Sequence, residues 1–127
     1  MWEAQGLSLQ DKYDDAIIRY RDALALLGDK EVLSSYACSI YQNIGEIYWE
    51  QQSFTDAFHY INLAVKCDGG LGSWSIHLRL GQIHFEQGNM KKAQDELMRA
   101  YMGGGLSAFE EEDPKYYALI QPHVERE

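Results

Sequence analysis

The chain has 127 residues and 46% of them are hydrophobic, so a disordered chain is excluded and one domain with a sizeable core is expected. Its net charge of -9 argues against nucleic acid or an anionic membrane as a partner, because phosphate groups are bound by clustered lysine and arginine. No apolar run approaches the ~20 residues of a membrane span, and the chain does not open on a basic and then apolar signal segment. We therefore expect a cytoplasmic protein or a domain of a larger one.

The chain begins with a weak helical pattern. Residues 1–11 are expected to form a short or frayed helix, because Gly6 lowers its helix propensity. A second helix is predicted over about 13–27, and Gly28 is expected to end it as a left-handed C-terminal cap. Because this first pair of helices is shortened, we expect that the sequence starts inside a longer protein.

Residues 32–67 show a clear helical hairpin pattern. Helices are expected over about 32–51 and from 54 to about 67, separated by a polar break, and each has apolar residues at the spacing of one helix face. These residues are Tyr41, Ile44, Gly45 and Tyr48 in the first helix and Phe54, Ala57, Ile61 and Ala64 in the second. Gly45 has no side chain and is expected to face the methyl group of Ala57, which lets the two backbones approach closely.

The same hairpin pattern recurs one repeat length later in the chain. Gly81 and Ala93 are spaced as the glycine and alanine of the preceding hairpin are. Helices are expected over about 74–87 and 90–101, and the run of three glycines that follows is expected to end the second helix.

The C-terminal stretch changes in character, with acidic residues followed by two prolines. Asp113 is expected to cap a helix that starts at Pro114 and that Pro122 ends. A stack of hairpins leaves its last pair uncovered on one side. We therefore expect this short helix to cover the stack, with Leu106 and Phe109 packed beneath it.

The repeated pattern resembles the tetratricopeptide repeat. In that family the first helix carries a large residue, then leucine and glycine, then tyrosine, and the second carries alanine, a large apolar residue and alanine. The match is specific in the second and third copies and partial in the first. Gly88 keeps the glycine that this family has in the turn between the two helices of a repeat, whereas Gln52 replaces it in the preceding copy.

The resemblance implies an all-α fold, namely a right-handed superhelical stack of antiparallel helix hairpins (a TPR-like α-solenoid) with a C-terminal capping helix. We expect a single domain over residues 1–127. Its repeats are expected at about 1–30, 38–71 and 74–107, with the capping segment at 108–127.

The resemblance also implies a concave groove, lined by the first helix of each repeat, that binds a peptide or protein segment in a scaffold or adaptor role. The groove positions are Gln42, Glu46, Trp49, Glu50, Leu78, Gln82, Phe85 and Glu86, with Gln5 and Ser8 as poorer equivalents in the first copy. Trp49 and Phe85 share a register off the core face, so they are candidate anchors for a partner. The alternative is that both rings pack against the neighbouring hairpin.

The charge of the groove indicates the kind of partner. Family members that bind a C-terminal carboxylate use lysine and asparagine in the groove, and the matching positions here hold Gln42, Glu46, Leu78 and Gln82. Three glutamates in the groove are expected to repel a carboxylate. We therefore expect a helix or extended peptide with an apolar anchor and basic residues.

Other residues that often carry chemistry have simpler interpretations. His77 and His84 lie two helical turns apart, too far for one metal ion, so we expect them to pack between helices. Cys38 and Cys67 are expected to be packed thiols rather than a disulfide. The paired glutamates fit a solvated face, and no nucleophile stands beside a base. We expect no catalytic residue, no metal and no cofactor, and hence no enzyme.

Self-association is the alternative function. A truncated first hairpin would expose the apolar side of the helix over 13–27, which includes Ile17, Ile18 and Leu24. Two chains would bury this side against each other, and the protein would then be a homodimer or the homo-oligomerising unit of a larger protein.

Overall fold

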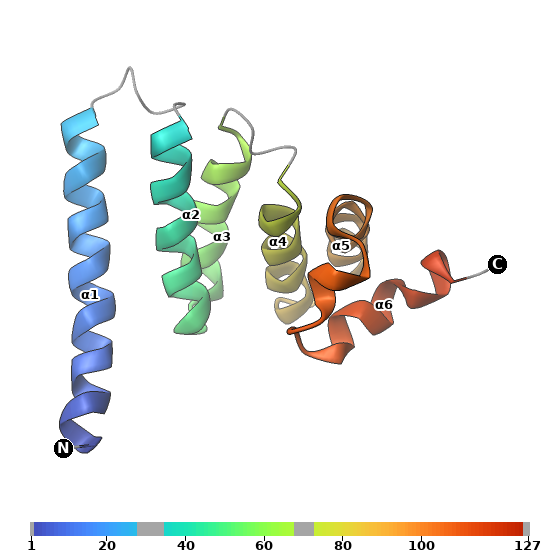
Figure 1. Cartoon of the computed structure of the whole chain (residues 1–127), viewed down its shortest axis with the longest axis horizontal. Helices are drawn as coiled ribbons and strands as arrows, with labels where there is room; N and C mark the ends of the chain where they lie inside the picture. Colours follow the sequence, from blue (N-terminus) through green and yellow to red (C-terminus); the bar gives the residue numbers. More distant parts are fainter. Residues whose placement is uncertain (1, 28–34, 68–72, 126–127) are drawn as a thin grey trace.

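A computed structural model of the chain describes residues 2–27, 35–67 and 73–125, and it is helical without any strand in these ranges (Figure 1). The elements in chain order are α1 (Trp2–Leu27), α2 (Ser35–Glu50), α3 (Phe54–Val65), α4 (Trp74–Glu86), α5 (Met90–Gly104), the short 3-10 helix η3 (Leu106–Phe109) and α6 (Pro114–Val124). None of the helices in these ranges combines the length and the hydrophobicity that crossing a bilayer requires.

The helices pack as hairpins that stand side by side. The most extensive contacts join α2 to α3 and α4 to α5, and α3 against α4 connects the two hairpins. In Figure 1, α1 lies beside the first hairpin, whereas α6 runs across the direction of the other helices. The all-α fold and the helical repeat architecture expected from the sequence are thus confirmed.

The first hairpin expected from the sequence is absent. Residues 2–27 form one continuous helix, so the prediction of a short helix followed by a second one was wrong. The physical reason is that residues 8–12 contain neither glycine nor proline, and Gly6 alone costs only about 1 kcal/mol of helix propensity. The expected helix cap and connector at 28–31, the side chains of Gln5 and Ser8, and the linker over 68–72 lie outside the described residues.

The two hairpins are held together where a glycine lets the helices touch. A methyl group added to Gly45 would lie 2.5 Å from the Ile61 side chain, and one added to Gly81 would lie 2.6 Å from that of Leu97. The expected close approach is therefore confirmed, but the glycine faces a large residue one turn beyond Ala57. The large side chain fills the space that the glycine leaves, and Ile61 is fully buried.

Three clusters of buried side chains form the core. One lies among α2, α3 and α4, and a smaller one lies between α1 and α2. The third joins α4 and α5 to η3 and α6, and it contains Leu78, Leu97, Phe109, Tyr116 and Ile120. The C-terminal helix thus covers the last hairpin with its own apolar side chains.

The C-terminal elements agree in part with the prediction. Asp113 caps α6 by accepting a hydrogen bond of 3.0 Å from the Lys115 backbone, and Pro114 opens the helix as expected. The prediction that Pro122 ends this helix was wrong, because α6 continues to Val124. Proline lacks the N–H that would donate to the carbonyl four residues earlier, and near the end of the helix this removes a hydrogen bond without stopping the last turn. Phe109 is buried as expected, whereas Leu106 is exposed.

The turns inside the two hairpins have the same backbone form. Gln52 has a φ of 60° and Gly88 a φ of 84°, which is the left-handed region that suits glycine. The N–H of Ser53 donates to the Tyr48 carbonyl at 2.9 Å, and that of Asn89 donates to the His84 carbonyl at 2.8 Å. Gln52 therefore occupies a turn position for which its side chain is unsuited.

This comparison predicts that Gln52→Gly raises the free energy of unfolding by about 1 kcal/mol, because the left-handed strain of a side-chain-bearing residue is relieved. Gly88→Gln is the reciprocal change, and no atom lies within 4 Å of an added Cβ, so its expected loss of stability comes from the backbone alone. Urea unfolding measures both variants. Loss of stability in Gln52→Gly would contradict the account of this turn.

Candidate functional site

The expected groove residues lie on two neighbouring helices in the same register. Helix α2 supplies Gln42, Glu46, Trp49 and Glu50, and α4 supplies Leu78, Gln82, Phe85 and Glu86. The Gln42 side chain donates a hydrogen bond of 3.3 Å to Ser75 of α4, which shows that the two helices face each other here. Two further elements, η3 and α6, pack against some of these positions.

Arg79 of α4 joins three of these positions into one network. Its Nε and Nη2 donate to the two carboxylate oxygens of Glu46 at 2.9 and 2.7 Å, and its Nη1 donates to Gln82 Oε1 at 2.6 Å. The guanidinium also lies over the Trp49 ring, 4.8 Å from its centroid. Sequence analysis missed Arg79, although a basic residue next to Leu78 in an acidic groove was a signal.

At two of the groove positions, another part of the chain covers the side chain. Gln82 is fully buried, and its Nε2 donates to Glu112 Oε1 at 2.6 Å. Leu78 is 6% exposed and belongs to the cluster that includes Ala108 and Phe109 of η3. At these two positions η3 and the turn that follows it lie over α4, so the side chains pack inside the protein.

Trp49 and Phe85 meet a third aromatic residue, Tyr116 of α6. The ring centroid of Tyr116 lies 5.2 Å from that of Phe85 in an edge-on arrangement and 6.5 Å from that of Trp49. Trp49 also contacts Phe54 at 5.5 Å. Both groove aromatics are half-buried, so they pack against neighbouring elements while keeping part of each ring accessible.

Glu86 is bound by two side chains of α6. Lys115 Nζ lies 2.8 Å from Glu86 Oε2, and the Tyr116 hydroxyl donates to the same oxygen at 2.7 Å. The hydrogen bonds from Lys115 and then from Tyr116 hold the pKa of Glu86 below its usual range. Burial, followed by the hydrogen bond to Glu86, raises the pKa of the Tyr116 hydroxyl.

The charges of the groove are therefore largely paired within the chain. Glu46 is matched by Arg79 and Glu86 by Lys115, whereas Glu50 is exposed. A hollow of about 330 Å³ remains beside these pairs, and Trp49, Glu50, Gln52 and Phe54 line it together with Glu86 and with Lys115 and Tyr116 of α6. A second hollow of about 340 Å³ is lined in part by Gln42, Trp74 and the acidic residues 110–112.

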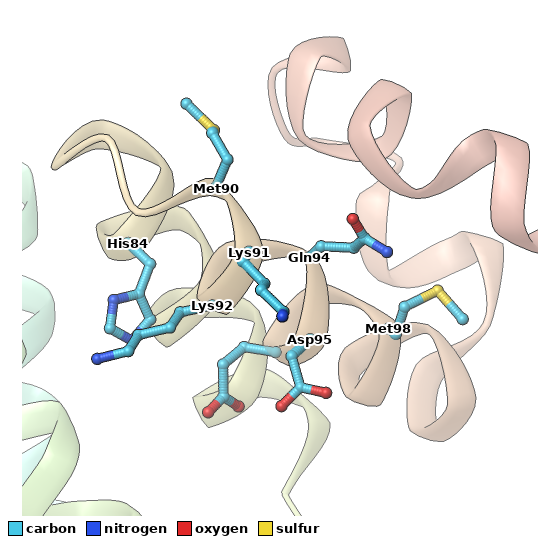
Figure 2. Close-up of a pocket in the computed structure, with 8 residues that line it drawn as sticks. His84, Met90, Lys91, Lys92, Gln94, Asp95 and Met98 are labelled. Carbon is cyan, nitrogen blue, oxygen red and sulfur yellow. The ribbon is translucent and has the colours of Figure 1, made fainter.

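Figure 2 shows a larger hollow, of about 920 Å³, along the surface of α5. Lys91, Lys92 and Asp95 project from this helix, and His84 lies at its edge. His84 packs against the Phe58 ring at 5.4 Å, and burial lowers the pKa of its imidazole, which is therefore neutral near pH 7. Charges of both signs on one open helix surface do not define a site, so we place the candidate site at the groove.

His77 and the two cysteines lie inside the helix packing. His77 is buried with its Nδ1 2.6 Å from Glu96 Oε1, as the packing interpretation of the two histidines predicts. Cys38 and Cys67 are buried thiols of one core cluster. Within residues 2–27, 35–67 and 73–125, no group of three or more His, Cys, Asp or Glu side chains is arranged to hold a metal ion.

The network around Arg79 predicts a stability difference between two arginines. Arg79→Met leaves the partly buried Glu46 and the fully buried Gln82 without their donor, so the free energy of unfolding is expected to fall by about 1–3 kcal/mol. Arg99→Met removes an exposed pair with Asp95 and is expected to change it by less than about 0.5 kcal/mol. Equal effects of the two substitutions in urea unfolding would show that the network does not order the groove.

Comparison with known protein families agrees with this geometry. The family model described as the tetratricopeptide repeat matches residues 39–69 and 75–102, which hold most of α2 with α3 and of α4 with α5. A comparison of the sequence with curated proteins finds none that matches it. The resemblance noted in the sequence is thus confirmed for the two complete hairpins. The family model thus identifies residues 39–69 and 75–102 as two consecutive tetratricopeptide repeats.

Proposed function

We propose that this chain binds a peptide or protein segment in the groove between α2 and α4, in a scaffold or adaptor role and without catalytic activity. Tetratricopeptide repeats are in general protein–protein interaction modules, which supports the class of function. The observation that carries the location is the hollow of about 330 Å³ where Trp49 and Phe54 meet the carboxylates of Glu50 and Glu86. Aromatic surface beside negative charge suits an apolar anchor flanked by lysine or arginine.

The ion pairs within the groove indicate which glutamate remains available to a basic residue of the partner. Glu46 already has a bidentate partner in Arg79, so it offers little attraction to a further cation. Glu50 is exposed at the rim of the same hollow as Trp49. The carboxylate of Glu50 is therefore the first expected contact for a partner's lysine or arginine.

Selection from a library of random displayed peptides tests this function with the whole chain as bait. Enrichment is expected in peptides that combine a large apolar residue with lysine or arginine. Glu50→Lys is expected to weaken the best peptide by about three- to tenfold, because attraction becomes repulsion at the rim. Asp95→Lys makes the same charge change on α5, away from the groove, and is expected to leave binding unchanged.

Two results of this selection would contradict the proposal. Failure to enrich any peptide that binds the purified chain would remove the support for peptide binding. Equal affinities of the Glu50→Lys and Asp95→Lys variants would place the bound peptide outside the groove.

Self-association is a second candidate, which exposed apolar residues of α1 support. Ile18 is 56% exposed and Leu26 is 89% exposed. Ile17 and Leu24 do not add to this surface as expected, because Ile17 is buried against α2 and Leu24 is half-buried. Light scattering over a range of concentrations decides the question, since a concentration-independent monomer would eliminate the homodimer.

A further inference from the structure

The groove already holds two side chains of the chain's own C-terminal segment, defined here as residues 110–117. Lys115 and Tyr116 both reach Glu86, and the Tyr116 ring lies against Phe85 and near Trp49. Tyr116 is only 5% exposed, so these contacts enclose it. Within the described residues, the aromatic part of the groove is therefore occupied from inside the molecule.

These two side chains have the chemistry expected of a partner. The aromatic ring of Tyr116 is the anchor, and its hydroxyl satisfies a groove carboxylate. Lys115 supplies the positive charge, with its ammonium 2.8 Å from Glu86 and 5.5 Å from the centre of the Phe85 ring. The groove thus holds a lysine followed by a tyrosine at the start of a helix.

The attachment of α6 to the protein does not depend on this contact alone. Ile120 is fully buried in the cluster with α5, and the Tyr117 ring contacts Phe109 at 5.6 Å and Tyr101 at 6.3 Å. The Lys115 side chain, by contrast, remains 44% exposed beside Glu86. Exposed ion pairs contribute little to stability, so a competing lysine replaces this one at low cost.

We propose that Lys115 and Tyr116 are a built-in ligand of the groove, and that the partner is a protein segment with a lysine followed by a tyrosine that takes their place. This inference rests on the proposed function, because it names the partner chemistry of the same groove. A tethered ligand acts at an effective concentration in the millimolar range. The apparent affinity for the partner is therefore the intrinsic affinity of the open groove multiplied by the fraction of molecules whose groove is open.

A labelled synthetic peptide with the sequence EEEDPKYYALIQPHV, which is that of residues 110–124, tests the proposal in trans on the full chain. Fluorescence anisotropy is expected to show about three- to fivefold tighter binding to the Lys115→Glu variant than to the wild type, because the internal ligand competes less well once its ion pair with Glu86 is replaced by repulsion. Lys91→Glu makes the same charge change on α5 and is expected to bind the peptide as the wild type does. Equal affinities of the two variants would overturn the proposal.

Two further measurements keep the test decisive. Tyr116→Phe removes only the hydroxyl that Glu86 accepts and is expected to raise peptide affinity, whereas Tyr117→Phe, the same change one residue on, is expected to have no effect. The Glu86→Lys chain is expected to prefer a peptide with glutamate in place of its lysine. If instead the wild type is a dimer that Lys115→Glu dissociates, the segment occupies a second copy and the intramolecular assignment is wrong.

The outcomes also separate this inference from the proposed function. If library peptides bind the groove and Lys115→Glu brings no gain, the built-in ligand is refuted and the proposed function stands. If neither library peptides nor the segment peptide binds any variant, both proposals fail.

Discussion

The close approach of paired helices at two glycines is the constraint on which the rest of the structure depends. At Gly45 the neighbouring helix presents Ile61, and at Gly81 it presents Leu97, with no room for even a methyl group between them. Each large side chain is fully buried against bare backbone, which fixes the depth and rotation of the hairpin. Because both hairpins repeat this contact, α2 and α4 present equivalent positions in the same register.

That register brings polar residues of α2 and α4 together. Arg79 reaches across to Glu46 and also covers the Trp49 ring, so one guanidinium satisfies a carboxylate and an aromatic face. Lys115 has the same combination of partners in Glu86 and Phe85. The acidic groove expected from the sequence is thus neutralised at two of its three glutamates, and its remaining attraction lies at Glu50.

Much of the fold was predictable because it rests on local patterns. Apolar residues at helical spacing located the two hairpins, and the glycine-to-alanine spacing indicated that they repeat. The continuous helix α1 was not predicted, because the helix–turn–helix pattern of the later repeats was expected here too. Residues 8–12 contain no glycine or proline that would end a helix between the two expected helices. The partner of Gly45 was misplaced by one helical turn, since both Ala57 and Ile61 lie on the buried face.

The resemblance predicts which positions of α2 and α4 line the groove, but it does not predict which side chains of the chain lie against them. The contact of Tyr116 with Phe85 and Glu86 joins residues far apart in sequence, and nothing in the local pattern around Tyr116 marks it. The acidic run before Pro114 identified a helix start and its cap, without indicating which surface the helix would cover. What the sequence did supply was the chemistry of a ligand for this groove, an aromatic anchor with a basic neighbour, and the chain contains one.

A tyrosine from the C-terminal segment fills the aromatic part of the groove. Its place is tested by the nuclear Overhauser contacts of the Tyr116 ring protons in the full chain, measured before and after addition of a groove-binding peptide. We expect contacts with Phe85 and Trp49 in the protein alone, and their loss when the peptide binds. A Tyr116 ring without contacts to either side chain in the protein alone would contradict this placement.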